Sequence, residues 1–537
     1  MERKKEMILI LASFVLLSIL ISLTSAEFPY SENIQEQTMS IRIENSLYTS
    51  ASRLNVNMTM FPLDDERQAS VINAFPQENL IPSIDTINFR FNEKGTVVFG
   101  VESEVRTRFL LKKLKEISLE ELKEQANTSE LEIYKKPSTY SDSDNFMIKN
   151  KALQLTKSNN SIEILYSLAE YVRNSMNYNL EKQDLRKASE IFQEKQGVCS
   201  HYTILFISLA RSLGFPSRYV SGVAYSNKIN DFQEHAWAEV YIPDYGWVPF
   251  DVTFGQYAWL DSSHVAFKKS IDAGEPSAKY RYSGGYIQPD QILIKTNVSS
   301  YLGFVDSNIT IKVEPYKDEV SQESYVPIKV RVTNNNNYYV ALPVRVSIAP
   351  QVYGKIQKIL LLEPNSFQET YFLIYLPYEE KCSRGCKTYV EIIDLFNNSQ
   401  TQELIFSDFK EKVSLQEALQ VINEPKSGDI DFYCKLGNST DENKTLICSI
   451  KSKESEKLTL CYKEQCYEQN LEKDKLTEVP IEIQTNQTNA CIQLKDSNLT
   501  LNSCVNVENE KKKSFLAKIL DWINFQLTGF IFFIQSI

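Results

Sequence analysis

Apolar and polar residues alternate along most of the chain, which is the pattern of half-buried β-strands. Residues 54–60 alternate without a break, and shorter runs of the same kind occupy 87–91 and 96–101. Residues 109–125 are highly charged and have a briefly helical pattern. We therefore predict a β-rich N-terminal domain over residues 27–138, similar to a sandwich, that carries no visible chemistry.

The spacing of apolar residues changes to that of α-helices after a polar linker at residues 140–144. One helix is predicted to begin with Ser161 as its N-cap, and a second runs through residues 185–192. A third opens at Cys199 and is stopped by Gly214-Phe215-Pro216. This third helix is apolar on most sides, so we expect it to be central.

Three strands follow the helices, at residues 218–225, 235–242 and 247–253. The second strand has a small, apolar face that can pack on the Cys199 helix, and its other face carries His235. The third strand carries Asp251. For these two polar side chains to be neighbours the strand pairing must centre near Pro243, which requires a bulge or a turn of odd length.

Strands resume beyond a linker with several Gly and Pro residues, expected at 271–295. Well-spaced alternating runs predict an immunoglobulin-like β-sandwich over residues 296–408. A short helix is expected near 411–423, within a disulfide-rich β domain that spans 409–510. Neither domain shows a catalytic constellation, so both are interpreted as spacers or interaction modules. The fold class is α+β, with a mixed core at 139–270 flanked by β-sandwich domains.

Both ends of the chain are membrane or targeting candidates. Residues 1–26 combine a mostly basic start, an apolar run from Met7 to Leu23 and a cleavage-like Thr24-Ser25-Ala26. They indicate a signal peptide or an uncleaved N-terminal anchor, and both place the rest of the chain outside the cytoplasm. Residues 511–537 form an amphipathic or membrane-associated segment, with partner docking or core packing as the alternative.

Cysteine usage agrees with export. Eight of the nine cysteines lie between Cys382 and Cys504, an even set that predicts disulfides rather than zinc, since no CxxC and no later histidine accompany them. Pairing of chain neighbours is the working hypothesis: 382–386, 434–448, 461–466 and 491–504. Ten N-x-S/T triplets suit a glycosylated surface, although an Asn-rich chain also produces them by chance. Cys199 is then left over as a single thiol.

The chain is acidic, with a net charge of −11 and a pI near 5.2, and this argues against a nucleic-acid partner. Hydrophobic residues make up 42% and charged residues 24% of the chain, so packed cores are expected rather than disorder.

A cysteine at the start of a helix meets the positive end of the helix dipole and unpaired N–H groups. Both favour the thiolate, and the same N–H groups could hold a developing oxyanion. Cysteine, then histidine, then carboxylate is also the chemistry of a thiol nucleophile with its base and orienting group. We therefore propose Cys199, His235 and Asp251 as catalytic residues. Taken singly, each has a structural alternative: a buried thiol, a core histidine and a turn cap.

The other two histidines are predicted to be structural. His201 lies about 200° around the helix from Cys199, so a local polar contact is favoured over a role as base. His264 lies beyond the strands that carry the proposed triad.

The stretch from residue 144 to 267 resembles the transglutaminase-like superfamily of papain-like thiol enzymes. The likeness is carried by these motifs, in order: Gly197-Val198-Cys199 with residues 209–222, then His235-Ala236-Trp237-Ala238-Glu239-Val240-Tyr241, then Gly246-Trp247-Val248-Pro249-Phe250-Asp251-Val252-Thr253. The resemblance implies Cys199 as nucleophile, His235 as base and Asp251 as orienting group. Two departures are mild: Val252 replaces the usual proline, and His201 stands where an acidic residue is common.

The resemblance implies acyl transfer at amide bonds of a protein or peptide substrate. Hydrolysis is favoured, because no acidic loop typical of calcium-regulated crosslinking enzymes stands out; transamidation, or a non-catalytic adhesion or scaffold role, remains the alternative. We expect no cofactor and no metal. Membrane attachment and cell-surface partners of the β domains are expected for an extracytoplasmic protein of this kind.

Overall fold

A computed structural model describes residues 31–83 and 86–422 and, between 430 and 506, seven strands with parts of their connections. The predicted signal or anchor at 1–26 and the predicted C-terminal segment at 511–537 lie outside the described residues. Among the described residues, no helix has the length and apolar character needed to cross a membrane.

The N-terminal domain is a sandwich of two four-stranded sheets, in the orders β17-β1-β6-β3 and β16-β2-β5-β4. Its strands are β1 (Ile34–Thr49), β2 (Arg53–Met58), β3 (Gln68–Phe75), β4 (Leu80–Ile81), β5 (Ile87–Phe91), β6 (Gly95–Arg108), β16 (Ala278–Ser283) and β17 (Ile287–Phe304), with a short 3-10 turn at Gln77–Asn79. The alternation in the sequence is confirmed, because apolar side chains of both sheets meet in one buried core.

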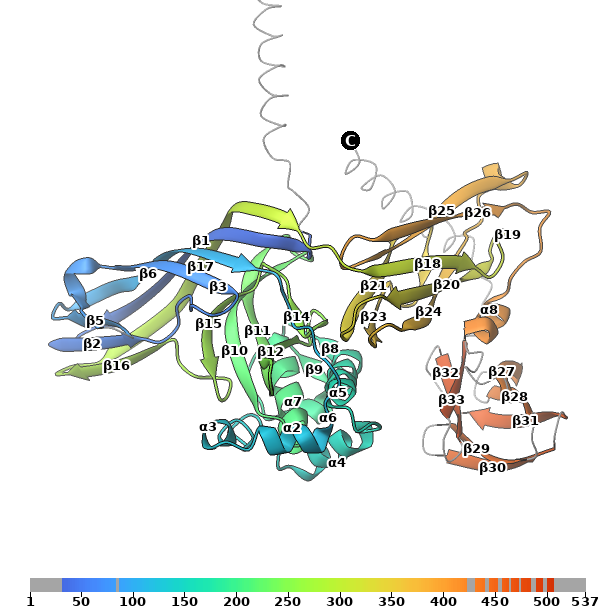
Figure 1. Ribbon diagram of the computed structural model, residues 1–537, viewed down its shortest axis with the longest axis horizontal. Helices are drawn as coiled ribbons and strands as arrows, with labels where there is room; N and C mark the ends of the chain where they lie inside the picture. Colours follow the sequence, from blue (N-terminus) through green and yellow to red (C-terminus); the bar gives the residue numbers. More distant parts are fainter. Residues whose placement is uncertain are drawn as a thin grey trace, which may run out of the picture.

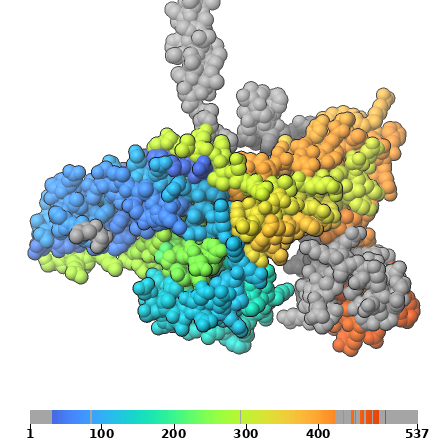
Figure 2. Space-filling view, in the orientation of Figure 1, coloured from blue at the N-terminus to red at the C-terminus, as the bar shows by residue number. Residues whose placement is uncertain are grey.

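The expected linker at 271–295 differs from the structure, which places β16 and the start of β17 there. β16 pairs with β2 and β17 pairs with β1, so this stretch completes the N-terminal sandwich. Gly284 and Gly285 form the turn between the two strands at positive φ, and Pro289 is tolerated because β17 is an edge strand. Figure 2 shows these yellow-green residues against the blue N-terminal ones.

The core places helices on one side of a five-stranded sheet of order β13-β12-β11-β10-β15 (Figure 1). Its helices are α2 (Leu119–Gln125), α3 (Ser129–Glu132), α4 (Phe146–Leu155), α5 (Ser161–Ser175), α6 (Ala188–Glu194) and α7 (Cys199–Ser212). Its strands are β10 (Ser217–Ser226), β11 (Asp231–Ile242), β12 (Gly246–Asp251), β13 (Gln256–Tyr257) and β15 (Val265–Ser270), with two short pairs: β7 (Leu110–Leu111) with β14 (Trp259–Leu260), and β8 (Asn177–Tyr178) with β9 (Gln196–Gly197).

Two local expectations for the core differ from the structure. The N-cap of α5 is Asn160, whose Oδ1 accepts from the N–H of Ile162, and Ser161 is already helical. The polar stretch at 140–144 is not a free linker. Ser141 is buried, and Asp272 accepts hydrogen bonds from its hydroxyl and from the N–H of Tyr140.

The predicted central helix is confirmed. Every residue of α7 from His201 to Arg211 is buried, and the helix ends where Gly214 adopts φ +92°. The small residues Ala236 and Ala238 of β11 share one buried core with α7, as the sequence predicted.

A second sandwich follows where an immunoglobulin-like domain is predicted, with sheets β18-β20-β24-β22 and β19-β26-β25-β21-β23. Its elements are β18 (Ile309–Pro315), β19 (Glu319–Val320), β20 (Tyr325–Asn334), β21 (Val340–Ile348), β22 (Val352–Tyr353), β23 (Gln357–Leu362), β24 (Phe367–Tyr375), a 3-10 turn at Glu380–Cys382, β25 (Cys386–Asp394) and β26 (Ser399–Phe406). The expected connecting helix is present as α8 (Leu415–Ile422).

The last domain is all β, with sheets β27-β28-β31 and β30-β29-β32-β33. Its strands are β27 (Ile430–Ser439), β28 (Lys444–Ser452), β29 (Glu456–Tyr462), β30 (Gln465–Leu471), β31 (Leu476–Ile483), β32 (Asn489–Lys495) and β33 (Thr500–Asn506). Three of the four predicted disulfides are confirmed: 382–386, 434–448 and 461–466. Cys491 and Cys504 are register partners, but their side chains lie outside what is described. Disulfides of this kind indicate an oxidising, extracellular environment.

Trp259 ties the core to the second sandwich. It belongs to β14 in the core, yet its side chain is fully buried among the apolar residues of the second sandwich. Its indole N–H donates to the carbonyl of Ala341 at 2.9 Å, and its ring stacks on Phe109.

We predict that Trp259→Ala lowers the free energy of unfolding by about 3–5 kcal/mol, because it opens a large cavity and removes a buried hydrogen-bond donor. Urea unfolding followed by far-UV circular dichroism measures the change. Phe409→Ala is the matched control: Phe409 is 82% exposed, so its loss should change stability by no more than about 0.5 kcal/mol. Equal effects of the two substitutions would contradict the assignment of Trp259 as a domain tie.

Candidate active site

Cys199 is the first residue of α7, as the sequence predicted, and it is half-buried. The chain enters this helix from β9 through Gly197, which has φ +156°. A Cβ at this position would lie 2.5 Å from the ring of His201, so only glycine fits. The close packing of Gly197 against His201 therefore fixes the turn that presents the thiol at the helix N-terminus.

His201 is a structural histidine, which confirms the local polar contact expected for it. Its Nδ1 accepts from the N–H of Val198 at 3.2 Å, and its Nε2 lies 2.9 Å from the carbonyl oxygen of Asp184. Burial lowers the pKa of His201, and the neutral ring is the form that can both accept at Nδ1 and donate at Nε2. His201 thus stabilises the start of α7 and does not act as the base.

The pairing of β11 with β12 brings His235 and Asp251 together. Register partners run from Ile242 and Gly246 to Ala238 and Phe250, without a bulge. The connecting turn therefore has an odd length, as predicted, but the ladder centres on Asp244 rather than on Pro243. Because the ladder centres one residue later than predicted, Asp251 lies diagonal to His235 rather than directly opposite it. Both side chains are still on the same face of the sheet, and the carboxylate is within reach of the imidazole.

His235 Nε2 lies 2.7 Å from Asp251 Oδ2, and both side chains are buried. This contact directs the other ring nitrogen, Nδ1, away from the carboxylate. Among the residues that the structure describes, Nδ1 has no hydrogen-bond partner within normal distance, while the Cys199 thiol is close enough to influence the charge of the ring. Cys199 and His235 also line the same pocket, of about 550 Å³. The three residues named from the sequence are therefore brought together in one place.

Asp251 is held by four hydrogen bonds. Its Oδ1 accepts from the N–H groups of Thr253 and Phe254, at 2.9 and 3.0 Å. Its Oδ2 faces both His235 and His264. Burial alone would raise the pKa of Asp251, but the two histidines and their hydrogen bonds outweigh burial and hold the pKa well below its usual range. The carboxylate is therefore ionised at neutral pH.

The charge on Asp251 determines the protonation state of His235. Burial works against the imidazolium, yet the charge and hydrogen bond of Asp251, with a further contribution from Cys199, raise the pKa of His235 to about 10. The ring is therefore protonated at neutral pH. An imidazolium beside a thiol is the partner that favours the thiolate.

His264 is buried and structural, as the sequence predicted, but its contact with Asp251 was not predicted. Its Nε2 lies 3.0 Å from Asp251 Oδ2, and its Nδ1 lies 3.0 Å from Asp261 Oδ1. Asp261 in turn accepts from Ser263 Oγ at 2.6 Å and from Gln256 Nε2 at 2.6 Å. The triad thus continues inward as His235–Asp251–His264–Asp261. The spacing Asp261-Ser262-Ser263-His264 was the available signal, since an acidic residue three positions before a histidine can fix its ring.

The nitrogen and oxygen atoms of His235, Asp251 and His264 lie within 4.8 Å of one another, a donor set that could hold a metal ion. The same atoms are already used in hydrogen bonds between these residues. A metal here would have to break the contact that orients His235, so the geometry fits an orienting network better than a metal centre.

Comparison with known proteins finds similarity in this part of the chain. Residues 149–252 match the model of the transglutaminase-like superfamily. An uncharacterised protein, YebA of Bacillus subtilis, is 27% identical over 154 residues, which cover 23% of this chain and 21% of that protein. The matched part is thus about a fifth of the length of this relative.

Two solved structures are also similar. A putative cysteine protease from Cytophaga hutchinsonii is 20% identical, with a TM-score of 0.39, over 50% of this chain and 93% of that one. Red sea bream transglutaminase is 9% identical, with a TM-score of 0.17, over 89% of this chain and 95% of that one.

The raised pKa of His235 predicts a stability contribution that depends on pH. A histidine whose folded pKa exceeds its unfolded value near 6.5 stabilises the fold fully below about pH 6.5, and this contribution is lost as the pH rises through about 10. We therefore expect His235→Gln to lower the free energy of unfolding more at pH 6 than at pH 10, as measured by urea unfolding of both proteins at each pH.

His201→Gln is the control for this experiment. Because the folded pKa of His201 is lowered, its contribution should not decline between pH 6 and pH 10. A stability difference between the wild type and His235→Gln that is the same at both pH values would show that His235 is not held in its charged form.

Proposed function

The chain carries a transglutaminase-like core, and we propose that this core is a cell-surface thiol enzyme that hydrolyses amide bonds of proteins or peptides through Cys199, His235 and Asp251. The observation that supports this most directly is the orientation of His235. Asp251 forms a hydrogen bond with Nε2 of His235, so that Nδ1 of the same ring is available to the thiol at the start of α7. Nucleophile, base and orienting carboxylate then follow one another in the order that thiol catalysis requires.

In the first half of the reaction, the Cys199 thiolate attacks the amide carbonyl and forms a C–S bond. The N–H groups of Cys199 and Ser200, the first two residues of α7, would stabilise the oxyanion that develops, because the first N–H groups of a helix have no partner within it. The C–N bond then breaks, and the His235 imidazolium gives its proton to the departing amine. The product is a thioester on Cys199, with a neutral imidazole beside it.

In the second half, neutral His235 takes a proton from water as the water oxygen attacks the thioester. The C–S bond breaks, the acid product leaves and the thiolate–imidazolium pair is restored. Asp251 remains ionised throughout and keeps the ring in place. The pocket around Cys199 and His235 has both polar and apolar lining, including Tyr178, Gln183 and Glu234, so water and a peptide segment can both enter it.

The setting supports an enzyme that works outside the cytoplasm. Three disulfides in the two C-terminal domains require oxidising conditions. We place the protein at the cell surface, attached to a membrane through residues 1–26 or 511–537, with the β domains available for protein partners. Cys199 keeps its thiol in this environment as the nucleophile, not as a disulfide partner.

The direct test is a peptide panel incubated with the full-length protein and a primary amine, with products identified by mass spectrometry. Cleaved peptides, or glutamine converted to glutamate, are expected for the wild type and absent for Cys199→Ala. His235→Ala should lower kcat/KM by about a hundredfold or more, because it removes the proton transfer. Ser200→Ala is the matched control: Ser200 lines the same pocket next to Cys199, and its loss should leave the activity within a few-fold.

The same panel separates the alternatives. Amine incorporation in excess of hydrolysis would identify a transamidating crosslinker instead of a hydrolase. If no product forms, and if iodoacetamide labels Cys199 no faster than a free thiol and equally in His235→Ala, then the core is a non-catalytic adhesion or scaffold module.

A further inference from the structure

The pocket that holds the thiol carries almost no formal charge apart from the catalytic pair. Its walls come from the start of α7, from β8 and the loop after it, from β10 and β11, and, across the domain boundary, from Met60 and Ile294. Among the described residues of this lining, Glu234 is the one acidic or basic side chain besides Cys199 and His235. A thiolate and an imidazolium cancel each other, so Glu234 makes the net charge of the pocket negative.

Glu234 lies on β11 directly before His235, on the face of the strand that also carries Ala236 and Ala238. That face packs on α7, whose first residue is Cys199. The carboxylate is therefore on the same side of the sheet as the thiol. The side chain is exposed, so that a molecule in the pocket can reach it.

The carboxylate of Glu234 has no partner within the part of the chain that the structure describes. The walls of the pocket desolvate it, which raises its pKa, and no charged neighbour counteracts this effect. Lys228, in the turn before β11, lies over the ring of Tyr178, with its Nζ 5.8 Å from the ring centre. The cation at the rim of the pocket thus contacts an aromatic ring and not the carboxylate.

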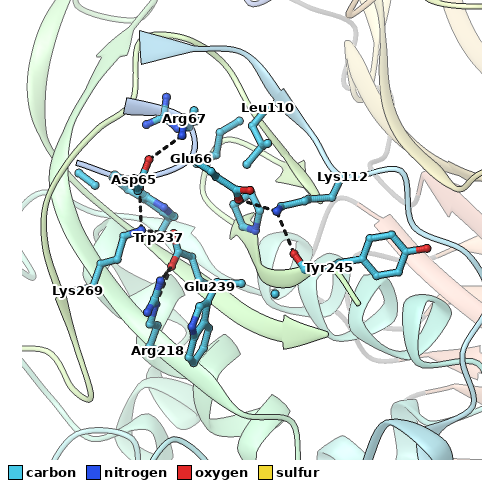
Figure 3. A pocket seen from close by; sticks show the side chains of 15 residues that line it. Asp65, Glu66, Arg67, Leu110, Lys112, Arg218, Trp237, Glu239, Tyr245 and Lys269 are labelled. Carbon is cyan, nitrogen blue, oxygen red and sulfur yellow. Dashed lines mark hydrogen bonds and ion pairs between the residues drawn. The ribbon is translucent and has the colours of Figure 1, made fainter. Parts of the chain in front are cut away.

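Glu239, later on the same strand, provides the contrast. Arg218 and Lys269 pair with its carboxylate at 2.5 and 3.3 Å, and Lys269 continues to Asp65 at 2.8 Å (Figure 3). Those charges are satisfied within the protein and join the core to the N-terminal domain. The strand therefore has one carboxylate that is paired for structure and another, Glu234, that is left unpaired beside the thiol.

We propose that Glu234 selects amide substrates that carry a lysine or arginine side chain close to the reacting bond. The cationic head pairs with the carboxylate and offsets the cost of its partial desolvation. The aliphatic stem meets an apolar wall, since Met60 and Ile294 line the same pocket and are packed against the core of the N-terminal sandwich. A neutral stem of equal length gains only the second contact, and an acidic side chain meets a like charge.

This inference rests on the proposed function, because it names the substrate class of the same site. Recognition can nevertheless be measured without turnover. The full-length Cys199→Ala protein keeps the pocket and forms no thioester, so its affinity for peptides reports recognition alone. The activity of the wild type then reports the chemistry, and the two assignments can fail separately.

The test is a series of labelled peptides of one sequence around a central glutamine, which offers both a side-chain and a main-chain amide. Lysine, norleucine or glutamate is placed in turn at each of the three positions on either side. Fluorescence anisotropy with full-length Cys199→Ala gives the Kd of each peptide. At one position or more, lysine should bind about fivefold more tightly than norleucine, and glutamate should bind more weakly than norleucine.

Variants of Glu234 test the charge argument. Glu234→Gln removes the charge and should bring the lysine and norleucine peptides to within about twofold of each other. Glu234→Lys should reverse the order and favour glutamate, whereas a merely structural role would weaken all peptides together. Glu181→Gln is the matched control: Glu181 is exposed in the loop after β8 and does not line the pocket, so the preference for lysine should persist.

The same peptides are then assayed for kcat/KM with the wild type, and products are identified by mass spectrometry. A lysine preference in binding without any product would support recognition and overturn the hydrolase assignment. Indifference to charge at every position, a preference that survives Glu234→Gln, or failure of every peptide to bind would overturn the inference. Crosslinking of the lysine peptide through its own amine would place the cation on the acceptor, and would overturn it as well.

Discussion

A single buried carboxylate, that of Asp251, is the interaction on which the candidate site depends. It is fully buried and accepts from two backbone N–H groups and two imidazole rings. A carboxylate in such a place is tolerated only because every lone pair has a partner. Once ionised, it sets the charge and the orientation of His235 beside Cys199. A buried carboxylate in the interior of the core thus determines how the reacting side chains near its surface are oriented.

The surrounding fold holds these side chains in place through successive layers of packing. The helix α7 is buried along most of its length, so the position of Cys199 cannot drift relative to the sheet. β11 packs its small side chains on α7 and turns its polar ones to the other face, toward the N-terminal domain. His264 and Asp261 follow β12 in the chain and extend the hydrogen-bond network beyond Asp251. The N-terminal sandwich and Trp259 cover the remaining surfaces of the core, so the flanking domains also stabilise it.

The parts predictable from the sequence were those encoded by local pattern. Periodicity located α7 and the strands. The order of Cys199, His235 and Asp251, together with the resemblance to transglutaminase-like enzymes, predicted the three residues that the structure brings together. Disulfide partners could be predicted because they are chain neighbours. The return of residues 278–304 to the N-terminal sandwich was not predictable, since strand partners more than two hundred residues apart leave no local signal. The same holds for His264, whose meaning depends on a contact with Asp251 that only the tertiary structure shows.

One face of β11 carries both a residue of the candidate site and an ion pair that reaches the N-terminal domain. Along one face, His235, Trp237 and Glu239 succeed one another at every second residue. His235 meets Asp251 and Glu239 meets Arg218, while the buried ring of Trp237 between them packs against Leu260 and Ala266. An apolar ring thus separates the group that Asp251 orients from the ion pairs of Glu239. Because Lys269 links Glu239 to Asp65, this end of the strand ties the core to the N-terminal domain while the other end holds the imidazole.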